Sequence, residues 1–177
     1  SDQFYEGKLK NGVTKEQRQT NVTRYDEKAI AWLNVDAEKG QEKGTSKESK
    51  YRPAEVERLQ NELYHVLQQT TDETIGIITF YKRQLVEIEA MIKNFPEVDQ
   101  LRIEVGTVDS FQGKEFDFVF LSTVRSNKRQ EVGFVSNANR LNVAFSRAKR
   151  VLAVIGDRAT ICGDEAKPVI PAFSTFE

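Results

Sequence analysis

The sequence predicts an α/β fold with a mainly parallel sheet and helices on both faces, and three features support this. Short runs rich in β-branched and aromatic residues recur, and two of them, 116–124 and 151–155, are largely apolar, as strands covered on both faces are. Segments with apolar residues at three-to-four spacing lie between the runs, which is typical of helices. The length of 177 residues suits one domain with its own hydrophobic core.

The first half of the chain alternates strand and helix patterns. The expected elements are a strand at 28–35, a helix from Pro53 with apolar residues at three-to-four spacing, a strand at 75–80 and a helix at 82–94. The intervening segment 36–52 is rich in Glu, Lys, Gly and Ser. We expect a flexible surface loop there, because such a composition buries little apolar surface.

The second half repeats the alternation around two polar blocks. Strands are expected at 103–108, 116–124 and 151–155, and helical periodicity covers 139–150. Loops at the carboxyl ends of parallel strands form the ligand crevice in such folds. We therefore expect both polar blocks, 109–115 and 139–150, at that edge of the sheet.

Charge is balanced over the whole chain but not locally. The 26 Lys and Arg residues face 27 Asp and Glu residues, so net charge gives no sign of a polyanionic partner. Between residues 122 and 156, however, only Glu131 opposes a set of cations. This set predicts a basic face and consists of Arg125, Lys128, Arg129, Arg140, Arg147, Lys149 and Arg150.

The remaining composition bounds the cellular context. The single cysteine, Cys162, cannot form an internal disulfide, which indicates a reducing compartment, cytoplasmic or, in a eukaryote, nuclear. Together with the single histidine, His65, it argues against a His/Cys metal site. No apolar run reaches membrane-spanning length and no signal-peptide pattern opens the chain. The chain starts at Ser1 without Met, so we expect a piece of a larger protein.

Two motifs carry a resemblance to a known family. Segment 106–115 (GTVDSFQGKE) resembles motif V of superfamily 1 helicases, and segment 140–148 (RLNVAFSRA) resembles their motif VI. The closest subgroup is the one that contains the nonsense-mediated-decay helicase, and the two motifs together, in the family's order and separation, are more specific than either alone. Segment 4–9 is similar to the region after that group's QYRMHP-type motif, and 76–81 to its motif IV. Motif IV usually reads Thr-Pro-Tyr where this chain has Thr79-Phe80-Tyr81.

The resemblance implies that residues 1–177 form the second RecA-like domain of an ATP-dependent DNA or RNA helicase. It implies ATP with Mg²⁺ as cofactor, single-stranded nucleic acid as track, and a missing first RecA-like domain as partner, which would supply the Mg²⁺ ligands. The chain has no Gly-x-x-x-x-Gly-Lys-Ser/Thr loop of its own, because segment 40–45 has the wrong spacing. We therefore expect the isolated chain to hydrolyse no ATP.

Arg147 is the candidate catalytic residue. Within the predicted helix 139–150, Arg140, Val143 and Arg147 fall on one side, since seven residues make nearly two turns. The resemblance implies that Arg147 is an arginine finger, which stabilises charge on the γ-phosphate during phosphoryl transfer. The alternative is a surface arginine paired with a carboxylate.

The block Gln112-Gly113-Lys114-Glu115 is the second candidate. Glycine lets the backbone approach a ligand, and a carboxylate can accept hydrogen bonds from ribose hydroxyls. The resemblance implies an ATP-binding set of Gln112, Gly113, Glu115, Arg140 and Arg147. The alternative is a tight turn with a solvated Glu and Lys. Asp109 and Ser110 suit a helix cap, and Asp109 is equally able to orient Arg147 or another motif residue.

Nucleic-acid contacts are expected from three groups of residues. Thr79 and Thr107 end strands, where a hydroxyl can meet a phosphate. Tyr81 can stack on a base or be a packed ring at the core edge. Arg125, Lys128 and Arg129 are candidates for backbone phosphates, or form a solvated basic loop.

Two rival functions stay open from the sequence. One is a nucleic-acid-binding or scaffolding module of a degenerate helicase-like protein that hydrolyses nothing. The other is a stand-alone nucleotide-binding α/β domain. The sequence upstream of Ser1 would separate the first rival from the helicase, and nucleotide affinity of the isolated chain would separate the second.

Overall fold

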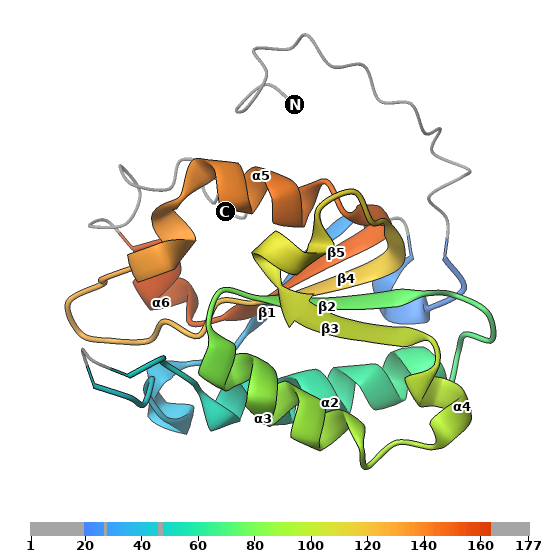
Figure 1. The fold of residues 1–177 in the computed structure, drawn as a ribbon, viewed down its shortest axis with the longest axis horizontal. Coiled ribbons are helices and arrows are strands. Elements are labelled where there is room, and N and C mark those ends of the chain that lie inside the picture. Colours follow the sequence, from blue (N-terminus) through green and yellow to red (C-terminus); the bar gives the residue numbers. More distant parts are fainter. Residues whose placement is uncertain (1–19, 27, 46–47, 164–177) are drawn as a thin grey trace, which may run out of the picture.

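A computed structural model describes residues 20–26, 28–45 and 48–163. Within this part of the chain, five parallel strands form one sheet in the order β1-β5-β4-β2-β3 (Figure 1). The strands are β1 (Ile30–Asn34), β2 (Ile75–Thr79), β3 (Ile103–Thr107), β4 (Phe116–Ser122) and β5 (Ala148–Gly156). Each strand overlaps a predicted one, so the predicted α/β fold with a parallel sheet is confirmed. Segment 4–9 lies outside the described residues.

Helices cover both faces of the sheet, as predicted. Figure 1 shows α2 (Pro53–Leu67), α3 (Lys82–Ile92) and α4 (Glu97–Gln100) on one face, and α5 (Ala138–Phe145) and α6 (Arg158–Ile161) on the other. Short 3₁₀ turns lie at η2 (Thr23–Tyr25), η3 (Ala37–Lys39), η4 (Val108–Phe111) and η5 (Gly133–Ser136). In the described part of the chain, no helix is long and apolar enough to cross a membrane.

The sheet is buried from both sides, which explains the nearly continuous apolar runs. Along β4, Phe118 and Phe120 pack into the core under α2 and α3, whereas Val119 and Leu121 pack into the core under α5. Successive side chains of a strand point to opposite faces. A strand with helices on both sides therefore needs apolar residues at every position.

The structure corrects the helix predicted at 139–150. Helix α5 ends at Phe145, and residues from Ala148 onward belong to β5. The N–H of Phe116 at the start of β4 donates to the Arg147 carbonyl oxygen at 2.9 Å, so pairing with β4 draws the chain into the sheet. Tertiary pairing here overrides the helical periodicity of the sequence. Arg147 consequently lies on the connection between helix and strand.

A buried arginine at the end of segment 36–52 holds this segment against the sheet. Arg52 Nη2 donates to the carbonyl oxygens of Val35 and Asp36, both at 2.8 Å. Its Nε donates to the Gly40 carbonyl oxygen at 2.7 Å, and the side chain is fully buried. Part of the polar segment is thus fastened to the core, and the flexibility expected for 36–52 as a whole stays a prediction.

Glu55 extends the same network to the carboxyl end of β4. Its Oε2 accepts a hydrogen bond from Ser122 Oγ at 2.6 Å and one from the Val124 N–H at 2.9 Å, and Arg52 pairs with Oε1 at 3.4 Å. Val124 has a φ of 70°, which is strained for a β-branched residue. Burial raises the pKa of Glu55 to about 7, although its bonds to Ser122, Val124 and Arg52 act to lower it.

Glu55→Gln is expected to change how stability depends on pH. Because the folded-state pKa is raised from 4.5 to about 7, the native state binds this proton more tightly than the unfolded chain does. The stability of the wild type relative to the variant is therefore greatest below pH 4.5 and falls as pH rises to about 7. The expected loss is up to about 3 kcal/mol. Urea unfolding of both proteins across this range measures it, and parallel pH profiles would contradict it.

Candidate functional site

Segment 108–115 crosses one face of the sheet beside α5. It leaves the carboxyl end of β3 as the turn η4 and reaches the amino end of β4. Val108 and Phe111 are buried in the same core as Leu141 and Ala144 of α5. This packing fixes the two motif segments side by side.

The crossing corrects the expectation that both polar blocks lie at the carboxyl edge of the sheet. Parallel strands all start at one edge, so each connection must return from the carboxyl edge to the amino edge. Asp109 stands near the first edge and Glu115 precedes β4 at the second. Likewise, Arg140 lies near the start of α5 and Arg147 precedes β5. The motif residues are therefore divided between two edges.

Arg147 lies at the amino edge, with its guanidinium held by neutral acceptors. Its Nε donates to the Val143 carbonyl oxygen at 3.0 Å, Nη1 to the Lys114 carbonyl oxygen at 2.8 Å and Nη2 to Ser146 Oγ at 2.8 Å. The side chain is half-buried, and no carboxylate among the described residues forms an ion pair with it. The alternative of a carboxylate-paired surface arginine therefore has no support in the described part of the chain. A guanidinium has five N–H donors, so two are left for a ligand.

Gln112, Gly113 and Glu115 lie exposed at the same edge as Arg147. Gly113 has a φ of 82°, which favours glycine, and a Cβ at this position would meet no atom within 4 Å. Glycine is thus required here by the turn, and the space in front of it is open. The Arg147–Lys114 bond fixes this turn to the end of α5.

Arg140 lies at the carboxyl edge, away from Arg147 and from the turn that carries Gln112, Gly113 and Glu115. Its Nη2 pairs with Asp109 Oδ2 at 3.0 Å, and its guanidinium carbon lies 5.9 Å from the centre of the Phe134 ring. Of the roles weighed for Asp109, the structure shows that it orients Arg140 rather than Arg147. Ser110 donates to the Thr107 carbonyl oxygen at 2.7 Å and does not cap η4.

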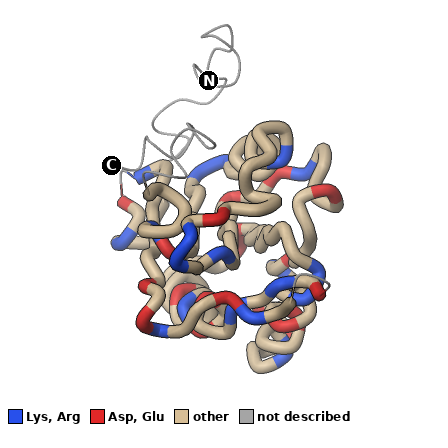
Figure 2. The backbone as a smooth tube through the Cα atoms, turned by 90° about the vertical axis from the view of Figure 1, so that its left-hand side faces the viewer, with Lys and Arg blue, Asp and Glu red and all other residues tan. Residues whose placement is uncertain are grey.

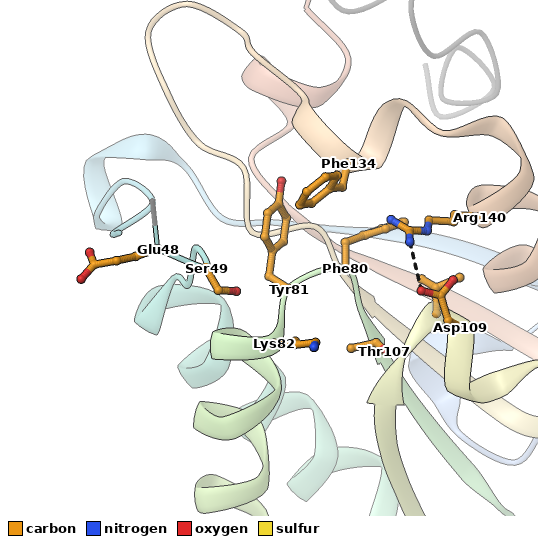
Figure 3. A pocket seen from close by; sticks show the side chains of 10 residues that line it. Glu48, Ser49, Phe80, Tyr81, Lys82, Thr107, Asp109, Phe134 and Arg140 are labelled. Atoms are coloured by element: carbon orange, nitrogen blue, oxygen red, sulfur yellow. Dashed lines mark hydrogen bonds and ion pairs between the residues drawn. The ribbon is translucent and has the colours of Figure 1, made fainter. Parts of the chain in front are cut away.

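A pocket of about 450 Å³ opens at the carboxyl edge (Figure 3). It is lined by Glu48, Ser49, Phe80, Tyr81, Lys82, Thr107, Val108, Asp109, Phe134 and Arg140. Thr107 is half-buried and reaches this pocket. Thr79 is fully buried beneath it and accepts the Tyr81 N–H at 3.5 Å, so its hydroxyl meets no solvent.

Tyr81 is a packed ring at the edge of the core. Its side chain is 4% exposed, and its ring centre lies 5.5 Å from that of Phe134. This geometry fits the second expectation for Tyr81, a packed ring at the edge of the core, better than a free surface for stacking on a base.

The three basic residues of the loop after β4 have different environments. Arg125 is buried, and its Nε pairs with Glu42 Oε2 at 2.9 Å. Burial acts to lower the pKa of Arg125, but the hydrogen bond to Glu42 raises it above its ordinary value. Lys128 is exposed, and the side chain of Arg129 is 86% exposed with Glu131 as its partner at 3.7 Å. Of these three residues, Lys128 and Arg129 are thus accessible to a nucleic-acid backbone and Arg125 is not.

The predicted basic face is divided and partly neutralised. Arg150 pairs with Asp117 at 3.2 Å, a partner that lies far away in the sequence. Glu42 likewise pairs with Arg125, and Asp109 pairs with Arg140. Figure 2 shows basic and acidic positions interleaved along the backbone.

Phe134 lines the pocket but is not among the site residues predicted from the sequence. Its side chain is 59% exposed at the mouth of the pocket, with Tyr81 on one side and Arg140 nearby. The signal was an aromatic residue inside a polar loop, directly after Gly133. Exposure of a large aromatic side chain cannot be read from one sequence.

Comparison with known proteins gives a family match over most of the chain. A family model described as "AAA domain" matches residues 1–159. The chain is 36% identical over 173 residues to Regulator of nonsense transcripts 1 homolog of Neurospora crassa, covering 93% of this chain and 16% of that protein. It is 34% identical over 165 residues to ATP-dependent helicase NAM7 of Saccharomyces cerevisiae, covering 89% and 17%. Helicase sen1 of Schizosaccharomyces pombe is 32% identical over 170 residues, covering 93% and 10%. The chain thus spans between 10% and 17% of these relatives.

Gly133→Ala is expected to destabilise the carboxyl-edge loop by about 1–3 kcal/mol. Gly133 has a φ of 55°, and an added Cβ would overlap Arg125 Nη1 and Tyr81 Oη. Arg125 cannot swing away freely, because it is buried and paired with Glu42. Denaturant unfolding measures the loss. Gly113→Ala is the matched control, since its φ is also positive but the space around it is open. Equal losses in the two variants would refute the proposed overlap.

Proposed function

The chain belongs to the AAA domain family, and on this premise we propose that it is the second RecA-like domain of an ATP-dependent superfamily 1 helicase. ATP with Mg²⁺ would bind between its amino edge and a first RecA-like domain of the same polypeptide. Single-stranded DNA or RNA would cross its carboxyl edge. Two relatives, in Saccharomyces cerevisiae and Schizosaccharomyces pombe, are named as ATP-dependent helicases, which supports this proposal.

The observation that carries the proposal is the state of Arg147. A half-exposed guanidinium that no described carboxylate neutralises is held rigid by the carbonyl oxygens of Val143 and Lys114 and by Ser146. Phosphoryl transfer builds charge on the γ-phosphate oxygens, and a pre-positioned arginine from a second domain stabilises it. Three neutral acceptors orient the side chain without cancelling its charge. This is the arrangement that an arginine finger requires.

The neighbouring turn supplies the other nucleotide contacts. Glu115 is exposed beside Arg147, where a carboxylate can accept hydrogen bonds from ribose hydroxyls. The open space at Gly113 lets a ligand or another domain approach the backbone, and Gln112 is exposed next to it. Because this sequence contains no phosphate-binding loop, the triphosphate and Mg²⁺ would be held mainly by the first domain. Arg140 stands at the opposite edge, so we leave it out of the nucleotide site.

The carboxyl edge would carry the nucleic acid. Thr107 reaches the pocket there, and Lys128 and Arg129 are accessible cations on the following loop. Contacts of this kind to phosphates are independent of sequence. Segment 108–115 and α5 run from this edge to Arg147. Nucleotide-driven movement at one edge would reach the other through this pair of packed segments.

In the full-length protein, Arg147→Ala is expected to lower ATP turnover by roughly 10³-fold or more. Affinity for single-stranded nucleic acid should stay close to that of the wild type, because Arg147 lies away from the carboxyl edge. Steady-state phosphate release and a strand-binding titration measure the two effects.

Lys149→Ala is the matched control for this experiment. Lys149 is an exposed cation of β5, two residues after Arg147, so its removal changes net charge equally at the same edge. Turnover of this variant should stay near wild type. Unchanged turnover in Arg147→Ala, or an equal loss in both variants, would rule out the finger assignment.

The isolated 177-residue chain is expected to hydrolyse no measurable ATP and to bind it weakly. It offers the finger and the ribose contact but no phosphate cradle. A titration with a fluorescent ATP analogue, compared with the full-length protein, measures the difference. Equally tight binding by the isolated chain would favour a stand-alone nucleotide-binding domain over a two-domain motor.

A further inference from the structure

Phe134 presents an exposed ring that the fold holds in place. The 3₁₀ turn η5 carries it, and the neighbouring Val135 is fully buried, which anchors the turn. The Tyr81 ring packs against it with centres 5.5 Å apart and planes inclined by 43°. A large apolar side chain that is 59% exposed yet supported by a packed ring is organised for a contact before any partner arrives.

Two cavities meet at this ring. The pocket of about 450 Å³ lies on one side, and a second cavity of about 460 Å³ shares Glu48, Ser49, Tyr81 and Phe134 with it. Each volume is in the range of roughly 300–1,000 Å³ found for small-molecule sites. The ring therefore stands at the centre of a recess that is large enough for a flat heterocycle.

The charges that line the first pocket favour an uncharged group. In the first pocket, Lys82 and Arg140 are balanced by Glu48 and Asp109. Arg140 already pairs with Asp109 at 3.0 Å. A phosphate would gain little net electrostatic attraction from so balanced a lining, whereas stacking of a base on an aromatic ring needs no net charge.

We propose that Phe134 is the stacking platform for one base of the bound single strand, seated in the pocket between Phe134, Tyr81 and Arg140. This inference rests on the proposed function, because it names the contact that the carboxyl edge makes with its track. The base stacks on Phe134, with the Arg140 guanidinium close to the same ring (Figure 3). Exposed cations outside the pocket, Lys128 and Arg129, contact phosphates. Stacking of this kind tolerates any base.

The test uses the full-length protein and a short labelled single strand, with affinity measured by fluorescence anisotropy over a series of salt concentrations. Phe134→Ala should weaken binding by about 5-fold to 100-fold. The slope of log affinity against log salt should not change, because no charge is removed. Phe134→Tyr should bind nearly as the wild type does, since the aromatic face is kept.

Two further comparisons separate stacking from a structural effect. Phe134→Leu keeps apolar volume without an aromatic face, and it should lose affinity as Phe134→Ala does. On a strand in which the bases are replaced by abasic sites, the wild type and Phe134→Ala should bind equally. Leu101→Ala removes another exposed apolar side chain, 88% exposed, that lies outside the pocket, and it should bind as the wild type does.

The results separate the stacking proposal from the motor-domain proposal. Wild-type affinity in Phe134→Ala, full affinity in Phe134→Leu, or the same loss on the abasic strand would overturn the stacking proposal and leave the motor-domain proposal standing. A full-length wild type that binds no single strand at all would overturn the proposed function and, with it, this inference. A changed salt slope in Phe134→Ala would show that the residue acts through phosphate contacts instead.

Discussion

The packing of segment 108–115 against α5 is the constraint on which the rest of the site depends. Val108 and Phe111 share one core with Leu141 and Ala144, so the two motif segments cannot move apart without exposing large apolar side chains. Polar contacts at both ends set the register of the two segments. Asp109 pairs with Arg140 at one end, and Arg147 donates a hydrogen bond to the Lys114 carbonyl oxygen at the other. The exposed ion pair adds little energy by itself. Burial holds the segments together, and the arginines determine how they are aligned.

This alignment separates two kinds of chemistry along one connection. The amino edge has a rigid cation without a described counter-ion and a turn of exposed polar residues, which suits a polyphosphate. The carboxyl edge has a neutral recess with an aromatic wall, which suits the flat face of a heterocycle. Parallel strands impose this separation, because each connection starts at one edge and ends at the other. A domain of this topology can therefore serve two ligands that never meet.

The sequence predicted the strands and the larger helices well, since burial on both faces demands long apolar runs such as 116–124. It failed where distant contacts decide the outcome. The helix predicted through Arg150 stops at Phe145 because β4 pairs with the following residues. The sequence predicts Arg125 to be an accessible cation, but Glu42, which lies 83 positions away in the chain, pairs with it and neutralises it. The sequence does not indicate Phe134, because the exposure of a side chain depends on the whole fold and periodicity carries no information about a residue in a loop.

The strained backbone at Val124 has a consequence for protein engineering. The loop that carries Lys128 and Phe134 leaves the sheet through this residue, whose φ of 70° is stabilised by the bond from its N–H to Glu55. Glu55 lies on α2, early in the chain and under the opposite face of the sheet. The direction of the loop is thus encoded outside the loop. A chimera that grafts residues 125–137 from another member of the family would transfer the side chains of the loop but not the direction in which the loop leaves the sheet. The direction is kept when the recipient also has the carboxylate at position 55 and the arginine at position 52.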